Sequence, residues 1–285
     1  MTRIPQWMMS ARVLAGLSVA ALICLAALFA PLLAPHDPNE QTLTSILLPP
    51  AWLPGGQADF PLGTDSLGRC VLSRLLYGAR IAMTVALLSS FGAMVLGAVL
   101  AHVAGYFGGA VDWLIGRVVD IWMSFPPVIL ALIFMVGLGP GLRNVILSII
   151  LVDWTRFCRV LRSEVLIVTR RDYVTAARLL GFSHWRIIAR EIAPATTPLL
   201  ITLASLEMGI AVIVEAILSF VGLSVTADTP AWGQMIADAR LSIYQSSWNL
   251  VFPVLAIFVT VFAFNILGDG LRRTLDVRLA EAQRA

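Results

Sequence analysis

The chain has 285 residues, of which 59% are hydrophobic and 13% are charged, whereas charged residues make up about a quarter of a typical soluble domain. Its net charge of +3 comes from arginine alone because the sequence contains no lysine. This excludes both the phosphate-binding loop of P-loop ATPases and a Schiff-base enzyme. The three cysteines and three histidines are widely spaced, so we expect no metal site and no cofactor.

Six charge-poor runs follow one another along the chain, each near the length of about 20 residues that a membrane-spanning helix needs. The first is longer than the apolar region of a signal peptide, so we expect it to remain in the mature protein. The fourth is the weakest because it contains Asp153. The sequence therefore predicts an all-α membrane protein with six transmembrane helices, over residues 13–33, 81–111, 121–138, 142–158, 197–223 and 250–267.

Arginines are concentrated on one side of this predicted arrangement, and cytoplasmic loops of membrane proteins carry such an excess. With six spans, both termini lie on the same side as the loop at residues 159–195. We therefore expect both termini and this loop in the cytoplasm and residues 35–80 outside. The arginines assigned to the cytoplasm are Arg3, Arg12, Arg117, those between residues 156 and 190, Arg272, Arg273, Arg278 and Arg284.

Residues 1–80 are predicted to form an N-terminal unit that precedes a five-helix core at residues 81–285. After its transmembrane helix this unit is first rich in proline and then amphipathic, with apolar residues at helical spacing up to Ala79. We expect the amphipathic part to be a helix that lies along the membrane surface, with Arg69 and Arg74 reaching the lipid headgroups.

Charged residues and prolines inside the predicted spans mark positions of special interest, because ionisable groups are costly in lipid. Arg117 and Asp120 are three residues apart, as are Asp153 and Arg156. We expect each pair to neutralise itself on one helix face. Pro126, which a second proline follows, is expected to break or kink the third span, either as a gating hinge or as a static kink.

Two acidic residues of the fifth span, Glu207 and Glu215, have no basic neighbour three or four positions away. They are eight residues apart and share roughly one helix face, so both are expected to face a pore or a partner helix. For Glu215, a structural hydrogen bond is an equal alternative. Asn265 in the sixth span is expected to bond across helices. The candidates for a polar pathway through the membrane are Glu207, Glu215, Pro126 and Asn265.

The loop after the fourth span contains a short helix with clear ends. Asp172 can act as its N-cap, and Gly181 suits the left-handed position that ends a helix. Ser183 can cap a second helix that runs to Ile192 and is stopped by Pro194. The segment is either a docking site for a partner or a connector that rests on its own bundle. A docking surface would combine a low patch with apolar anchors, at Ala176, Ala177, Tyr173, Leu180 and Phe182.

This loop resembles the EAA loop of the permease subunits of ABC importers, on Ala176, Ala177, Gly181 and the ending Ile192-Ala193-Pro194. Thr175 stands where that family has its glutamate, while Asp172 still serves the start of the helix. In the family, the loop holds a coupling helix that fits a cleft on the ATPase subunit. The resemblance implies an ATPase-coupling role for Asp172, Tyr173, Ala176, Ala177, Arg178, Leu180, Gly181, Phe182 and Arg186.

Four further segments are similar, in the same order, to segments of dipeptide, oligopeptide and nickel permeases. These segments cover residues 61–80, 215–223, 229–233 and 264–278. Cys70 stands where the family usually has an acid, so an ion pair is expected to be missing there. The long proline-rich outer loop fits the C-type of the two permease subunits in such systems.

The resemblance implies the type I ABC importer permease fold and a place in the bacterial inner membrane. It also implies four kinds of neighbour: a second homologous permease subunit, two ATP-binding subunits, an extracytoplasmic solute-binding protein and the lipid membrane, with no nucleic acid. We expect a transport subunit, not an enzyme, that forms half of the pathway for di- or oligopeptides by alternating access. Nickel is the alternative solute. A proton-coupled secondary transporter with Glu207 and Glu215 as its relay is the rival mechanism, although such proteins usually show an internal repeat.

Overall fold

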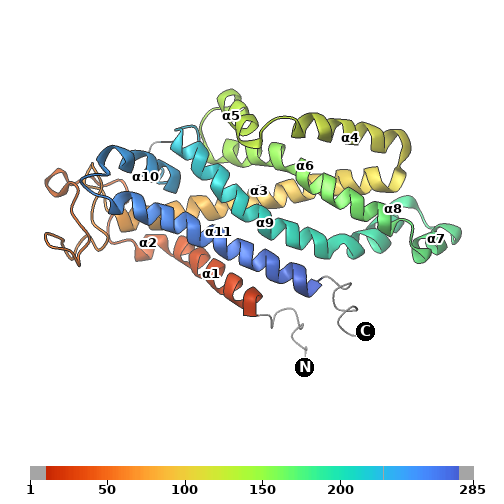
Figure 1. Ribbon diagram of the computed structural model, residues 1–285, viewed down its shortest axis with the longest axis horizontal. Helices are drawn as coiled ribbons and strands as arrows, with labels where there is room; N and C mark the ends of the chain where they lie inside the picture. The colour runs from red at the N-terminus through yellow and green to blue at the C-terminus, as the bar shows by residue number, and fades with distance from the viewer. Residues whose placement is uncertain (1–10, 227, 276–285) are drawn as a thin grey trace.

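Long helices that run side by side along the longest axis of the molecule form most of the structure (Figure 1). The computed structural model describes residues 11–226 and 228–275, and every regular element in these ranges is helical, which confirms the predicted all-α class for them. The five long helices are α1 (Ala11–Leu28), α3 (Val71–Phe107), α6 (Leu142–Val168), α9 (Ala193–Phe220) and α11 (Trp248–Leu275).

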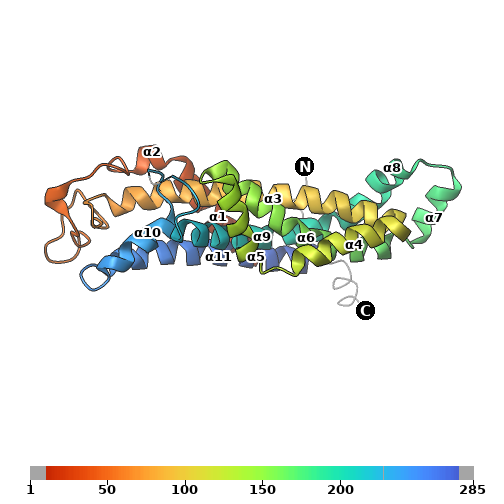
Figure 2. The same cartoon turned by 90° about the horizontal axis from the view of Figure 1, so that it is seen from above.

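Shorter helices connect the long ones, and some of them gather at the two ends of the bundle (Figure 1). Residues 34–70 and α10 lie at one end, and α7 and α8 lie at the opposite end, in both views (Figures 1 and 2). We call these the α10 end and the α7 end. The short helices are α2 (Ala30–Leu33), α4 (Gly109–Met123), α5 (Pro127–Leu138), α7 (Asp172–Leu179), α8 (His184–Ile187) and α10 (Trp232–Ala239).

Small residues let the long helices approach one another closely, which is the usual basis of helix packing in membranes. A Cβ atom on Gly97 of α3 would lie only 2.5 Å from the Cβ of Phe157 and from the carbonyl oxygen of Trp154 on α6. Gly16 of α1 has the same role against α11, where an added Cβ would lie 2.6 Å from the backbone nitrogen of Leu267. These contacts leave no room for larger side chains at the two helix crossings.

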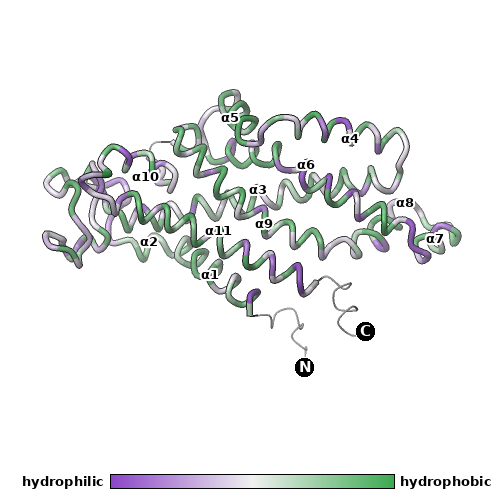
Figure 3. The backbone as a smooth tube through the Cα atoms, viewed as in Figure 1, coloured by the Kyte–Doolittle hydropathy of each residue, from purple (hydrophilic) through white to green (hydrophobic). Residues whose placement is uncertain are grey.

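The outward faces of the bundle are apolar over most of their length (Figure 3). Large hydrophobic side chains such as Leu22, Leu32 and Phe258 are exposed there. Helices α1, α3 and α11 are long and apolar enough to cross a membrane, as is the continuous helix over residues 184–220. The pair α4 and α5 would supply a fifth span if its two parts count as one. Helix α6 is continuous over 27 residues, or about 40 Å, but charged residues interrupt its apolar sequence.

Two predictions about the second and third spans are affected by where helices begin and break. The second span and the expected surface helix form one continuous helix, α3. The prediction of a separate helix on the membrane surface was therefore wrong. The expected division of the chain after residue 80 falls inside this helix. The third span is broken at Pro126 as predicted, because α4 ends at Met123 and α5 starts at Pro127 with a bend of 89°.

Pro194 does not stop the second helix of the loop at residues 159–195, contrary to the prediction. Helix α8 passes through a π-helical turn at Ile188–Ile192 into α9, so that residues 184–220 are continuous. Pro194 lies in the first turn of α9 after this wider turn, at a position where the missing N–H of proline is tolerated. Of the motif predicted at residues 264–278, Asp276, Val277 and Arg278 lie outside the described residues, as do Arg3 and Arg284.

Candidate functional site

Helix α7 is terminated by Gly181 as the sequence predicts, whereas its start differs from the prediction. Arg171 occupies the N-cap position and Asp172 is the first helical residue, so Asp172 is not the cap itself. Gly181 has φ +73°, which confirms its left-handed conformation. The backbone N–H of Gly181 donates to Arg178 at 3.0 Å, and that of Phe182 donates to Ala177 at 3.2 Å. These two bonds satisfy carbonyls that would otherwise be left open at the helix end.

One face of α7 packs on the bundle and the other is open. Val174 and Ala177 are buried, so the predicted low docking patch reduces to Ala176. Tyr173 is 45% exposed and Leu180 is 72% exposed. Leu179, which the sequence did not single out, is 85% exposed. Of the other predicted docking residues, Asp172, Arg178, Gly181 and Arg186 are exposed and Phe182 is half-buried.

Aromatic and cationic side chains fasten the α7 end to the last turn of α3. The hydroxyl of Tyr106 lies 2.9 Å from Nδ1 of His184, and the guanidinium of Arg178 lies 5.0 Å from the centre of the Tyr106 ring. The guanidinium of Arg186 lies 4.1 Å from the Phe182 ring. Beneath them a buried cluster joins α7 and α8 to the long helices α3 and α6, and Leu199 and Leu200 of α9 pack against this cluster.

A polar groove separates α4 from α6. Arg162 of α6 forms a two-bond ion pair with Asp112 of α4. Arg159 of α6 donates to Asp120 of α4 at 2.5 Å. The predicted pair of Arg117 with Asp120 is therefore wrong, because the partner of Asp120 comes from a neighbouring helix. Between the two helices lies a cavity of about 320 Å³.

Glu207 meets a partner helix, which is one of the two predicted situations for it. Its Oε2 accepts a hydrogen bond of 3.0 Å from Arg156 of α6. Glu207 is 3% exposed, and Asp153 is buried beside it. The ion pair predicted between Asp153 and Arg156 is replaced by the pair of Arg156 with Glu207. Two acids and one half-buried arginine therefore meet where α6 packs against α9.

The other pathway candidates lie apart from this group. Glu215 is buried and accepts hydrogen bonds from Ser219 at 2.5 Å and Ser224 at 3.1 Å, as the alternative of a structural hydrogen bond predicts. Asn265 donates to Val261 of its own helix at 2.9 Å, so the predicted bond across helices was wrong. Its side chain is exposed, and the carbonyl one turn back is within reach. Pro126 is exposed at the break between α4 and α5.

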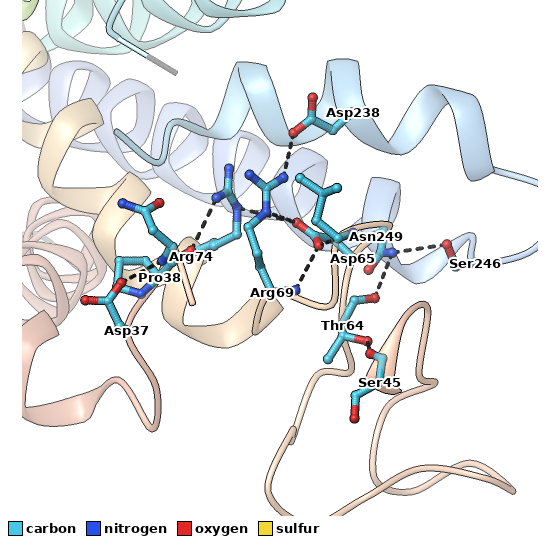
Figure 4. A network of polar contacts seen from close by, with 12 residues as sticks. Asp37, Pro38, Ser45, Thr64, Asp65, Arg69, Arg74, Asp238, Ser246 and Asn249 are labelled. Carbon is cyan, nitrogen blue, oxygen red and sulfur yellow. Dashed lines mark hydrogen bonds and ion pairs between the residues drawn. The ribbon is translucent and has the colours of Figure 1, made fainter. Parts of the chain in front are cut away.

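At the α10 end, a network of charged groups joins residues 34–70 to α3 and α10 (Figure 4). Asp65 Oδ2 accepts from Arg69 Nε at 2.6 Å and lies 3.8 Å from Arg74 Nε. Arg69 Nη2 reaches Asp238 of α10 at 3.0 Å, and Arg74 Nη1 donates to the carbonyl of Pro38 at 3.3 Å.

Arg69 and Arg74 therefore do not reach lipid headgroups, because their guanidinium groups bind carboxylates and a carbonyl of the chain itself. Arg74 is only 1% exposed. The sequence could have suggested the pair of Asp65 with Arg69, which are four residues apart. No local signal points to Asp238, which lies 169 positions from Arg69.

Comparison with known protein families gives two matches. Residues 78–281 match the family described as binding-protein-dependent transport system inner membrane component. Residues 11–50 match the N-terminal TM domain of oligopeptide transport permease C. Together the two matches take in almost the whole of the bundle described above.

Curated proteins of similar sequence align with most of the chain. The di/tripeptide transport system permease protein DppC of Pseudomonas aeruginosa is 42% identical over 94% of this chain and 89% of its own length. The dipeptide transport system permease protein DppC of Escherichia coli K12 is 42% identical over 93% of this chain and 89% of its length. The nickel transport system permease protein NikC of the same strain is 41% identical over 93% of each.

Among solved structures, the fold resembles a chain of the MetNI methionine ABC transporter in an inward facing conformation. The two superpose with a TM-score of 0.59 over 71% of this chain and 96% of that chain. Their sequences are 18% identical, so this likeness concerns the fold alone.

Proposed function

The chain belongs to the family of inner membrane components of binding-protein-dependent transport systems, and we propose that it forms half of an import pathway for di- or oligopeptides. Membership makes it an ABC transporter permease of the bacterial inner membrane, in which separate subunits hydrolyse ATP. Peptides are the first proposed solute because relatives at 42% identity are named as peptide permeases. Nickel is the second, because NikC is 41% identical.

We propose six membrane spans with both termini in the cytoplasm. Four helices are long and apolar enough to cross a membrane, α4 with α5 offers a fifth span, and α6 is long enough to be the sixth. The first residue of α1 and the last residue of α11 are at the tips of these helices that are nearer to the α7 end (Figure 1), as an even number of crossings requires. The α7 end would then lie in the cytoplasm, and residues 34–70 would lie outside. Together with the span α1, residues 34–70 would form the N-terminal unit.

The observation that carries the proposed mechanism is the two-sided nature of α7. Val174 and Ala177 hold the helix to the bundle, while Tyr173, Leu179 and Leu180 project large apolar surface beyond its end. Exposed aromatic and aliphatic residues around a few charges are typical of a docking surface. We propose that an ATP-binding subunit covers this surface and that Asp172, Arg178, Gly181 and Arg186 border the contact.

The proposed assembly contains a second similar permease, two ATP-binding subunits and an external solute-binding protein. Closure of the ATP-binding subunits would move α7, and the cluster beneath α7 would pass that movement to α3, α6 and α9. This is a two-state transition in which a ligand at one site shifts the population of states at another. Glu207, Glu215, Pro126 and Asn265 remain proposed positions for the pathway.

A pair of glycines allows a controlled test of the docking role. Gly181 and Gly222 close α7 and α9 with the same two backbone bonds, at φ +73° and +80°, and an added Cβ would meet nothing within 4 Å at either position. Valine should strain the backbone at both positions by a similar amount. In the reconstituted transporter, we expect Gly181→Val to abolish peptide uptake while ATP hydrolysis continues, and Gly222→Val to retain coupled uptake.

Both variants must be recovered from the membrane in equal amounts for the comparison to hold. Normal uptake with Gly181→Val, or an equal loss of coupling with Gly222→Val, would show that α7 is not the coupling helix. The solute is decided by parallel uptake of a labelled dipeptide and labelled Ni²⁺. Loss of uptake on collapse of the proton gradient at constant ATP would favour the proton-coupled alternative.

A further inference from the structure

The groove between α4 and α6 is lined by more basic than acidic side chains. Its cavity of about 320 Å³ is bordered by two acids, three arginines and a tryptophan, namely Asp112, Asp120, Arg117, Arg159, Arg162 and Trp113. A space of this size at a helix–helix boundary admits a polar headgroup together with water. None of these residues belongs to the docking surface of α7.

The two acids of the groove are already paired, which leaves one arginine in excess. Asp112 is bound through both oxygens by Arg162, and Asp120 is bound by Arg159. Arg117 has no carboxylate within ion-pair distance among residues 11–226 and 228–275. Its guanidinium lies 5.9 Å from the centre of the Trp113 ring. The groove therefore offers a positive charge and free N–H donors to an anion.

Apolar surface continues directly from this charged groove along α4. Only Val119 of α4 is buried. The exposed side chains at helical spacing form one apolar stripe, at Val111, Leu114, Val118 and Ile121. Trp113 is also exposed, and tryptophan is enriched where membrane proteins meet lipid headgroups. A cationic groove beside an apolar stripe has the two-part chemistry of a phospholipid.

We propose that the groove binds the headgroup phosphate of an anionic phospholipid of the inner leaflet, with Arg117 as its principal contact. The acyl chains would lie along the stripe at Val111, Leu114, Val118 and Ile121. Basic pockets between transmembrane helices on the cytoplasmic side bind anionic headgroups in general. The assignment to the inner leaflet rests on the proposed orientation, in which the α7 end is cytoplasmic.

Bound lipid would hold α4 against α6 from the outer side of the pair. Helix α4 is otherwise joined to α6 by the ion pairs of Asp112 and Asp120 and by a hydrogen bond of 2.6 Å from Trp122 Nε1 to the carbonyl of Leu151. Because α4 leads into the break at Pro126, its position also sets the start of α5. The lipid would thus stabilise one arrangement of the broken pair.

The test measures lipid retention by the assembled transporter and needs no transport. The complex is purified from mixed vesicles of phosphatidylglycerol and phosphatidylcholine, and co-purified lipid is counted by native mass spectrometry. We expect wild type to retain phosphatidylglycerol in preference, and Arg117→Gln to weaken this preference about fivefold, the loss expected for one arginine near a headgroup. Arg117→Lys should keep most of it, because the positive charge remains.

Arg143→Gln is the matched control, since Arg143 is an exposed arginine at the other end of α6. Absence of any preference in wild type, or an equal decrease with Arg143→Gln, would overturn the proposal. So would displacement of the lipid by excess free dipeptide, which would assign the groove to a solute carboxylate. Because retention is read without uptake, a negative result leaves the proposed peptide import standing, and failed uptake leaves the lipid result standing.

Discussion

The two ends of the molecule differ in which side chains they bury and which they expose. At the α10 end, charged groups that could face water are drawn inward, so that Arg74 is 1% exposed and Asp65 serves two arginines. At the α7 end, large apolar groups that could be buried project outward, with Leu179 85% exposed. The charged groups of the α10 end find their partners within the chain, although Leu241 is exposed there as well. In the proposed assembly a partner covers the apolar groups of the α7 end, and the contacts of α7 within the chain hold it in place.

The largest effect on stability is expected from Asp65→Asn, which disrupts the charged network of the α10 end. The change leaves Arg69 with Asp238 alone and removes the ion-pair partner of Arg74, and breaking a buried ion pair costs about 3–5 kcal/mol. Thermal unfolding of the purified chain measures this loss. Asp238→Asn is the control, because Asp238 is half-buried and its single ion pair contributes about 1 kcal/mol or less. Equal losses in both variants would show that the network is not centred on Asp65.

A second prediction compares two leucines with the same exposure at opposite ends. Leu179 on α7 and Leu241 after α10 are both 85% exposed. We expect Leu179→Asp to leave thermal stability unchanged but to weaken co-purification with the ATP-binding subunit by at least about thirtyfold, the effect of losing an interface hot spot. Leu241→Asp should affect neither quantity. Intact association with Leu179→Asp would mean that both ends are equally independent of the ATP-binding subunit.

The smallest effect is expected from Tyr106→Phe, which loosens α7 without touching its exposed face. The change removes the hydroxyl that lies 2.9 Å from His184 Nδ1 and keeps the ring under Arg178. A hydrogen bond of this kind contributes about 0.5–1.5 kcal/mol. Hydrogen exchange at the amides of α7 should become faster by the factor that corresponds to this loss of free energy. The amides of α10 should keep their rates. Unchanged exchange at α7 would show that the buried cluster alone holds the helix.

The sequence predicted features that depend on local chemistry. Apolar runs located the long helices, two adjacent prolines located the break at Pro126, and a glycine located the left-handed end of α7. Each of these outcomes is set by residues within one or two turns. The class of transporter also followed from short ordered motifs, which the family match later confirmed.

Contacts between distant segments could not be derived from the same information. A single sequence offers a charged residue only its neighbours at three or four positions, and this rule assigned Asp120 to Arg117 and Asp153 to Arg156. In the folded chain, Arg159 and Glu207 compete more effectively because adjacent helices present them at hydrogen-bonding distance. The same limit hid Asp238. Pro194 failed as a stop signal because a π-helical turn accommodates it.

The continuity of α3 has a mechanical consequence. Its 37 residues give a rod of about 55 Å without an internal proline, and side-chain contacts hold both of its tips. Trp232 Nε1 of α10 donates to the carbonyl of Leu75 near one tip, and Tyr106 meets His184 at the other. Tilting such a rod by about 5° about one tip would displace the other by about 5 Å. A small rotation at the α7 end, which is the nucleotide side in the proposed assembly, would thus move the α10 end directly, with no relay of individual contacts in between.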